Sequence, residues 1–224
     1  MLNRIHLDTV GSTNDYAKEL LQRAPGEYVV TANEQTSGRT TKGDKWYSPR
    51  GNLFLSAAIR LGNRRFSDMA LVSALTVAEA IDSDAVLVKW PNDILVNVKK
   101  ACGILVERDG EFAIAGIGVN VIHAPPPGIS AYPTTSLARE GIAITAEKLG
   151  ERIIARLFAN LALDFTKIIE GISPRMYRIG KRITILSRGE TITGVFEGLD
   201  INGGLILDGR TILSGEMTKE NFNT

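Results

Sequence analysis

The 224-residue sequence has few of the residues that build disulfides and metal centres. It contains one cysteine, Cys102, and two histidines, His6 and His123. One thiol cannot form an internal disulfide or a cysteine-rich metal site, and two histidines are too few for a histidine-built one. This usage is typical of the reducing cytoplasm, where we expect the protein to be found.

An excess of one charge and long apolar runs are lacking as well. Lysine and arginine number 26 and aspartate and glutamate 25, which gives a formal net charge of +1. That balance does not favour a polyanionic partner such as DNA, and any cationic site must be local. No apolar run approaches the roughly 20 residues that cross a bilayer, and the N-terminus has no apolar signal core. We expect a soluble protein with neither DNA nor a membrane as partner.

Apolar runs and turn residues predict a protein that contains both strands and helices. Strands are predicted at residues 5–7, 28–32, 53–59, 85–88, 94–96, 103–106 and 112–117. The last four are short and joined by turns, which indicates a largely antiparallel meander and not an alternation of strand and helix. Helices are predicted to begin at Ser12 and near Ser67 and Asp68.

The C-terminal part predicts one long helix followed by a change of pattern. Thr145 is a helix cap, and apolar residues recur near every fourth position until Gly171. After Pro174, brief strands separated by glycine turns predict a small β-barrel of roughly 45 residues. We therefore predict two domains, residues 1–178 and 179–224.

The first segment that can carry chemistry is the loop from Gly38 to Trp46, with sequence GRTTKGDKW. It could close over an anion, because glycine lets backbone N–H groups approach phosphate oxygens and Arg39 can hold a carboxylate or phosphate with paired donors. Trp46 could stack on a planar base or pack in the core. A solvated basic loop is the alternative, and these residues alone leave both interpretations open.

The second segment runs from Lys89 to Asp93, with sequence KWPND, directly after an apolar strand. A desolvated lysine needs an anionic partner, and such a pair is worth about 4 kcal/mol at ~4 Å and an effective dielectric near ~20, before desolvation. A substrate phosphate could be that partner, or Asp93 within an ordinary turn. Lys100 and Gly103 follow, and they add a second lysine and a close approach of the backbone.

Two further segments carry weaker signals. Gly116 to Asn120 ends a strand with two glycines and an amide, which a simple turn also explains. Ser12, Thr13 and Asn14 form an ordinary helix N-terminus, yet their hydroxyls and free N–H groups could bind a small polar head group. Neither segment identifies a ligand by itself.

Together, and in this order, these segments resemble the catalytic core of biotin protein ligases. The most specific likeness is KWPND at Lys89 to Asp93, followed by KACGILVE at Lys100 to Glu107. EQTSGR at Glu34 to Arg39 and KWYSP at Lys45 to Pro49 support it. The resemblance implies an α+β fold, with a mixed, largely antiparallel sheet packed by helices and a C-terminal SH3-like barrel.

The resemblance also implies a role for each motif residue. The residues expected to bind biotin are Ser12, Thr13, Asn14, Gln35, Gly38, Arg39, Lys100 and Gly103. The residues expected to bind ATP are Arg39, Thr40, Thr41, Trp46, Lys89, Asn92 and Asn120. Arg39, Lys89 and Lys100 would be the catalytic cations, and Asp93 would organise the lysines or act through Mg²⁺ bound with ATP.

The implied reaction is ATP-dependent activation of biotin as biotinyl-5′-AMP, followed by transfer to a lysine of a biotin carboxyl carrier protein such as that of acetyl-CoA carboxylase. The rival functions are a lipoate or octanoate transferase on a related core, and a non-catalytic sensor of biotin or its adenylate. Family members often dimerise, so a homodimer is a further expectation. Only eleven residues precede Ser12, so we expect no DNA-binding domain and no repressor role.

The basic loop departs from the pattern that the resemblance implies. Thr40 and Thr41 stand where the family usually has a second Gly-Arg pair, and Asp44 occupies a position that is often basic. One expected cation is therefore missing. We expect weaker retention of the adenylate intermediate, unless Lys42 compensates.

Overall fold

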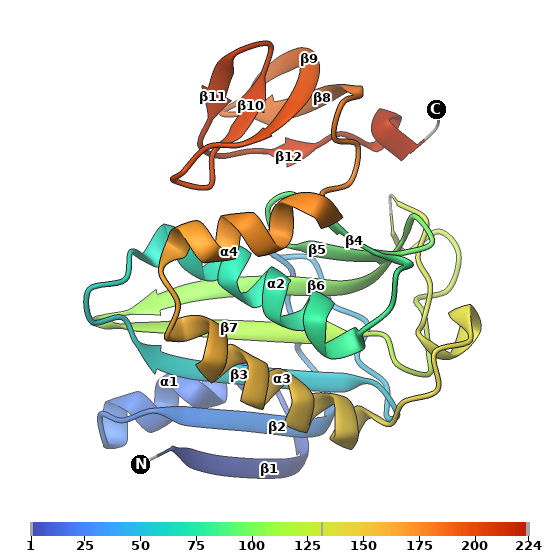
Figure 1. The fold of residues 1–224 in the computed structure, drawn as a ribbon. Coiled ribbons are helices and arrows are strands. Elements are labelled where there is room, and N and C mark those ends of the chain that lie inside the picture. Colours follow the sequence, from blue (N-terminus) through green and yellow to red (C-terminus); the bar gives the residue numbers. More distant parts are fainter. Residues whose placement is uncertain (1, 131, 223–224) are drawn as a thin grey trace.

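The computed structural model describes residues 2–130 and 132–222, and it contains two sheets (Figure 1). The larger sheet has the strand order β1-β2-β3-β7-β6-β5-β4. Its strands are β1 Asn3–Val10, β2 Tyr28–Gln35, β3 Leu53–Arg60, β4 Val86–Lys89, β5 Asp93–Val96, β6 Lys99–Asp109 and β7 Phe112–Val119. β1 pairs with β2 in parallel, and the other neighbours pair antiparallel. The predicted fold class, a mixed and largely antiparallel sheet packed by helices, is confirmed.

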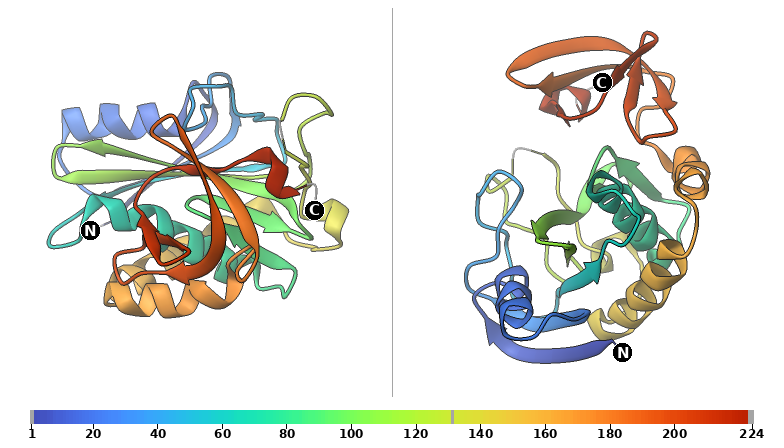
Figure 2. Two further views of the ribbon diagram at one scale, coloured as in Figure 1. Left: turned by 90° about the horizontal axis from the view of Figure 1, so that it is seen from above. Right: turned by 90° about the vertical axis from the view of Figure 1, so that its left-hand side faces the viewer.

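Helices cover the two faces of this sheet unequally, as Figures 1 and 2 show. α1 (Thr13–Arg23) packs on one face, against β2, β3 and β7. α2 (Met69–Ile81), α3 (Ala146–Leu161) and α4 (Phe165–Ile172) lie on the other side, where the larger apolar core forms. Among the described residues, no helix combines the length and the apolar character that a membrane crossing needs.

The alternation of side chains along β6 and β7 separates the core from the site. Ile104 and Ile117 point into the core on the α2 side. Gly103, Gly116 and Gly118 lie between such positions, and since neighbouring strand residues face opposite ways, they line a cavity on the α1 side. Three glycines on one face leave a hollow where side chains would otherwise stand.

The single long helix predicted from Thr145 to Gly171 is wrong in its length. Thr145 does cap a helix, because its hydroxyl accepts a hydrogen bond from the N–H of Lys148 at 3.2 Å. This helix, α3, ends at Leu161. A second helix, α4, begins at Phe165 and continues through Gly171. A guanidinium nitrogen of Arg64 donates to the carbonyls of Leu161 and Leu163. The guanidinium of Arg64 thus supplies donors to carbonyl groups at the end of α3. The spacing of apolar residues along the sequence does not reveal this contact, because Arg64 is distant in the chain.

The C-terminal segment forms a second, antiparallel sheet in the order β11-β10-β9-β8-β12. Its strands are β8 Arg182–Ser187, β9 Glu190–Leu199, β10 Leu205–Leu207, β11 Arg210–Ile212 and β12 Glu216–Met217. The sequence did not indicate β12, which is only two residues long. The described strands show no pairing of β11 with β12, so closure into an SH3-like barrel stays a prediction, as does the domain boundary after residue 178.

A buried tryptophan joins the second sheet to the main one. Trp90 is 2% exposed, and its indole N–H donates to the carbonyl of Gly203 at 3.0 Å. Gly203 has φ +82, and a Cβ there would lie 2.6 Å from Leu71 Cδ1, so glycine allows this approach. The KWPND turn and the second sheet are therefore held together by a hydrogen bond that water does not reach.

Replacing Trp90 by Phe should lower the free energy of unfolding by about 1–3 kcal/mol, because the Gly203 carbonyl loses its buried donor. Urea denaturation followed by circular dichroism measures the change. The control is Leu213→Ala at a side chain that is 70% exposed on the same segment, where the effect should stay within about 0.5 kcal/mol. A Phe variant as stable as the wild type would contradict this account of the junction.

Candidate functional site

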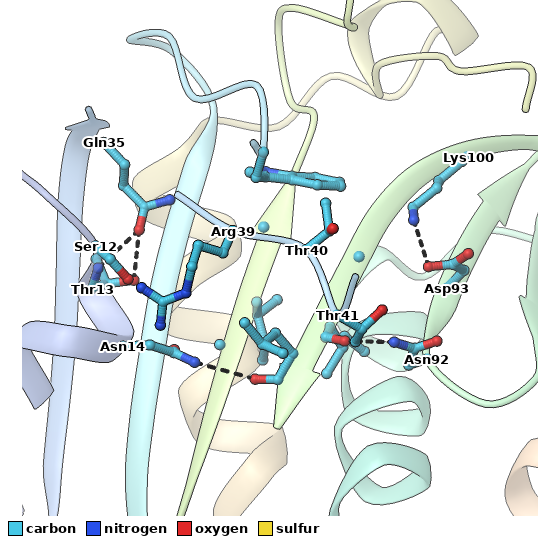
Figure 3. Close-up of a pocket in the computed structure, with 17 residues that line it drawn as sticks. Ser12, Thr13, Asn14, Gln35, Arg39, Thr40, Thr41, Asn92, Asp93 and Lys100 are labelled. Atoms are coloured by element: carbon cyan, nitrogen blue, oxygen red, sulfur yellow. Dashed lines mark hydrogen bonds and ion pairs between the residues drawn. The ribbon is translucent and has the colours of Figure 1, made fainter. Parts of the chain in front are cut away.

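The glycine-lined hollow is the inner of two adjoining chambers, and Figure 3 draws the residues that line it. The inner chamber is lined by Ser12, Thr13, Asn14, Gln35, Arg39, Gly103, Leu105, Gly116 and Gly118, among others. The outer chamber has a volume of about 600 Å³, which is large enough for a nucleotide-sized ligand. The two chambers share a wall formed by Thr40, Thr41, Trp46, Asn92, Asp93 and Lys100.

The N-terminus of α1 forms one end of the inner chamber. The N–H and the hydroxyl of Thr13 both donate to Gln35 Oε1, at 2.8 and 3.1 Å. Ser56, which the sequence did not indicate, lies behind them, with its Oγ 2.7 Å from Thr13 Oγ1 and 2.6 Å from Asn14 Oδ1. These contacts fix several polar groups around a space that a small polar ligand could enter.

Gly38 supports this end of the chamber without lining it. A Cβ at Gly38 would lie 2.8 Å from both Gln35 Nε2 and Ser48 Oγ. Its role in this structure is to let the chain pass close to Gln35, whose amide N–H donates to Ser48 Oγ at 3.3 Å. Direct ligand binding by Gly38, which the family resemblance implied, stays a prediction.

Arg39 reaches into the same chamber, where two acids hold its guanidinium. It forms a paired contact with Asp15, and Glu107 lies 3.4 Å away. The hydrogen bond from Arg39 is the main reason that the pKa of Asp15 lies below its ordinary value. Burial raises the pKa of Glu107, but hydrogen bonds from Lys18 and Asn14 and the nearby charges outweigh it, so that pKa also lies below the usual value. Both acids are therefore charged at neutral pH.

Asp15 and Glu107 were not predicted as site residues. Asp15 is an ordinary first-turn acid of a helix, and Glu107 ends the KACGILVE motif. They lie 24 and 68 positions from Arg39, so only the fold brings the three together. A ligand carboxylate in the inner chamber would compete with both acids for the guanidinium.

Asp93 is the centre of the wall between the chambers. Its two carboxylate oxygens contact Lys89 Nζ at 3.2 Å and Lys100 Nζ at 2.7 Å, and Lys89 and Asp93 are buried. Burial alone raises the pKa of Asp93, but the attraction of Lys100 and Lys89 outweighs it, and the pKa lies below its ordinary value. Lys89 Nζ also lies 4.8 Å from the ring centroid of Tyr132, which the sequence did not indicate.

Trp46 lies against β6 and β7 between the two chambers. A Cβ at Gly103 would come 3.0 Å from the Trp46 ring, and one at Gly118 would overlap its indole nitrogen. This nitrogen is buried and, within the described chain, has no hydrogen-bond partner. Lys100 Nζ lies 5.4 Å from the ring centroid. The indole is thus fixed flat on the sheet beside the shared wall, with one donor unused.

Two asparagines of the outer chamber differ in the hydrogen bonds that their side-chain amides form. Asn92 donates to the carbonyl of Ile104 at 2.8 Å, which ties the KWPND turn to β6. Asn120 is 1% exposed and donates to the carbonyl of Thr135 at 3.0 Å, while its Oδ1 has no partner among the described residues. A buried acceptor without a partner is costly, so Asn120 is well suited to receive a hydrogen bond from a ligand.

The second sheet completes the outer chamber. Its contributors are Leu186, Arg188, Gly189, Gly215 and Glu216. Glu216 forms an ion pair with Lys42 of the basic loop at 2.7 Å, and this hydrogen bond raises the pKa of Lys42. The sequence left the role of the C-terminal segment open between a stabiliser and a platform. The structure places part of that segment in the wall of the cavity.

The chamber walls offer little for a metal ion by themselves. Within the described residues, no group of three or more histidine, cysteine or acidic side chains is arranged to hold one. Asp93 is one carboxylate, and both of its oxygens already contact lysines. Mg²⁺ commonly uses one or two carboxylates together with substrate phosphates and water, so Asp93 fits a metal that arrives with a nucleotide.

Comparison with known proteins gives one consistent result. A model of the biotin/lipoate A/B protein ligase family matches residues 7–121, and a model of the biotin protein ligase C-terminal domain matches residues 179–219. A biotin--[acetyl-CoA-carboxylase] ligase of Paracoccus denitrificans is 33% identical over 88% of this chain and 91% of its own length.

Solved structures agree with these sequence matches. A biotin protein ligase from Aquifex aeolicus in complex with biotin and ATP has a TM-score of 0.86 at 29% identity, over 96% of this chain and 97% of that one. One from Leishmania major in complex with biotinyl-5-AMP has a TM-score of 0.66 at 26% identity, over 96% and 98% of the two chains.

Replacing Asp93 by Asn should lower the free energy of unfolding by about 3–5 kcal/mol at pH 7, because Lys89 and Lys100 lose the carboxylate with which both form ion pairs. In the wild type, the folded-state pKa of Asp93 is lower than the ordinary value of 3.8. The stabilisation is therefore present above that value and is lost as the pH falls through the lower folded-state pKa. The difference in unfolding free energy between the wild type and the Asp93→Asn variant should become smaller only below about pH 4.

Urea titrations at several pH values measure this difference. The control is Asp44→Asn, an exposed acid of the basic loop in the outer chamber, which should change stability by no more than about 0.5 kcal/mol. Equal stability of the Asp93 variant and the wild type at pH 7 would show that the carboxylate does not hold the lysines.

Proposed function

The chain belongs to the biotin/lipoate A/B protein ligase family, and on this premise we propose that it is an ATP-dependent biotin–protein ligase. It activates biotin as biotinyl-5′-AMP and transfers the biotinyl group to a lysine of a biotin carboxyl carrier protein. The observation that carries the proposal is the pair of adjoining chambers whose shared wall holds Lys100 and Asp93. Two substrates in two such chambers would meet at a cationic wall.

The inner chamber suits biotin. Thr13, Asn14 and Gln35 surround its far end with donors and acceptors, which match the N–H and C=O groups of a ureido ring. Leu105 and the ring of Trp46 add apolar surface for the rest of the ligand. With the ring at that end, the carboxylate of the side chain would point toward the shared wall and Lys100.

The outer chamber suits ATP. The unpartnered Oδ1 of Asn120 can accept a hydrogen bond from the adenine amino group. Lys89 and Lys100 line the side next to the inner chamber, where the α-phosphate would lie. Asp93, together with the phosphates, would hold Mg²⁺, which adds positive charge against the triphosphate.

The chemistry needs charge neutralisation more than proton transfer. A carboxylate oxygen of biotin forms a bond to the α-phosphorus, and the bond to the leaving pyrophosphate breaks. Both reactants are anionic, so Lys89 and Lys100 act by lowering their repulsion and by stabilising the equatorial oxygens. No general base is required, because the attacking carboxylate is already ionised.

In the second step, the amine of a carrier lysine attacks the acyl carbon, loses a proton, and AMP leaves. The protein must position the amine and limit the access of water. The basic loop lines both chambers, with Thr40 and Thr41 in the shared wall. Figure 3 shows these two threonines among the residues of the inner chamber. This position lets the basic loop cover the intermediate. The acceptor we propose is the biotin carrier domain of a carboxylase such as acetyl-CoA carboxylase, in the cytoplasm.

Pyrophosphate release tests the proposal directly. Release should require both biotin and ATP, and label from radioactive biotin should appear on a carrier protein. The same labelling assay with lipoate in place of biotin distinguishes this activity from a lipoate or octanoate transferase. A biotin ligase should label the carrier with biotin and not with lipoate. Binding of biotin without any pyrophosphate release would indicate a sensor and would contradict the proposed function.

Lys100→Met should lower kcat/KM for adenylate formation by about 10²–10³-fold, because one preorganised cation at the reacting atoms is lost. Lys99→Met is the matched control. Lys99 is the neighbouring residue in the chain, but its ammonium group pairs with Glu140 at 3.0 Å outside both chambers. Pyrophosphate assays on both variants make the comparison, and equal activities would exclude the role given to Lys100.

Thr41→Arg should slow the release of biotinyl-AMP, because it restores a cation where the loop crosses the shared wall. Lys42 is paired with Glu216, so part of its charge is already engaged. The off-rate is measured by single-turnover formation of the adenylate followed by a chase. Thr41→Gln controls for side-chain size. An unchanged off-rate in the Arg variant would contradict the prediction that a cation at position 41 slows the release of biotinyl-AMP.

A further inference from the structure

The cations of the outer chamber differ in how much of their charge is already balanced. Lys89 and Lys100 share Asp93, and Lys42 pairs with Glu216. Arg188, which comes from the second sheet, lines the same chamber. Within the described parts of the chain, it takes part in no hydrogen bond or ion pair. An exposed guanidinium that lines a cavity and has no counter-charge among the described residues is available to bind an anion.

The backbone around Arg188 fixes where this side chain starts. β8 ends at Ser187 and β9 begins at Glu190, so Arg188 and Gly189 form a two-residue hairpin turn. Both have positive φ, +51 and +83. Such turns favour Asn or Gly at the first position, and an arginine there costs conformational energy. The tight turn places Arg188 at the wall of the outer chamber.

The direction of the nucleotide follows from the reaction. The α-phosphorus must lie next to the inner chamber, beside Lys89 and Lys100, so that the biotin carboxylate can reach it. Asn120 offers an acceptor for the base, in a wall completed by Ile129 and Tyr132. The β- and γ-phosphates then need another cationic part of the chamber. Lys45 of the basic loop and Arg188 of the second sheet both line it without a side-chain hydrogen bond or ion pair among the described residues, and of these two Arg188 offers the paired donors that suit phosphate oxygens.

We propose that Arg188 binds the β- and γ-phosphates of ATP, the part that leaves as pyrophosphate. The proposal rests on the proposed function and adds to it a substrate-binding residue from the C-terminal sheet. A guanidinium can donate two parallel hydrogen bonds to phosphate oxygens. The second sheet would thus take part in recognising the triphosphate.

The test compares ATP with AMP, because AMP lacks the two phosphates in question. In the full-length chain, Arg188→Gln should weaken ATP binding by about tenfold, as for the loss of one charge-assisted hydrogen bond. AMP binding should change by less than about twofold, and Arg188→Lys should recover part of the ATP affinity. Isothermal titration calorimetry with each nucleotide gives the dissociation constants.

The matched control is Arg210→Gln. Arg210 is an exposed arginine on β11 of the same sheet and does not line the chamber, so both affinities should stay unchanged. Arg188 lies in an exposed turn, so its variants should fold, and thermal unfolding checks this.

Three outcomes would overturn the proposal. One is unchanged ATP affinity in Arg188→Gln, and another is an equal loss for AMP and ATP, which would indicate recognition of the base or a structural role. The third is unchanged nucleotide binding with a loss only in transfer to the carrier, which would place Arg188 in carrier docking. A wild-type chain that binds no ATP would instead overturn the proposed function itself.

Discussion

Asp93 carries a negative charge where there is little water, and the rest of the site depends on how that charge is balanced. Lys89 at the end of β4 and Lys100 in β6 approach it from two sides. One carboxylate between two ammonium groups leaves one positive charge in excess, on a wall that two chambers share. Partial burial strengthens the attraction of that wall for an anion. The fold thus creates a place where two anionic reactants can approach each other.

The sheet serves both stability and function because its two faces carry different residues. On the α2 side, large apolar residues such as Ile104 and Ile117 build the core. On the α1 side of the same strands, Gly103 and Gly118 leave room for Trp46 and for a ligand. The second sheet, joined by Trp90, then brings a further wall to the outer chamber. The glycines of β6 and β7 therefore supply the space of the site, and charged residues from other parts of the chain line its walls.

The sequence predicted the parts of the site that are local in the chain. The KWPND turn and the lysine of β6 are close in sequence and pair across neighbouring strands, so their convergence follows from a simple meander. It did not reveal Asp15 and Glu107, because their contacts with Arg39 depend on how α1 and β6 pack. The break between α3 and α4 was missed for a similar reason, since apolar spacing continues across it while a distant arginine satisfies the helix end.

The convergence of two substrates at the Asp93 wall is tested most directly by a crystal structure with biotin and a non-hydrolysable ATP analogue. The account predicts the biotin carboxylate and the α-phosphate together beside Lys100, with the ureido ring at Thr13 and Gln35. Biotin bound outside the inner chamber, or an α-phosphate remote from Lys89 and Lys100, would contradict it.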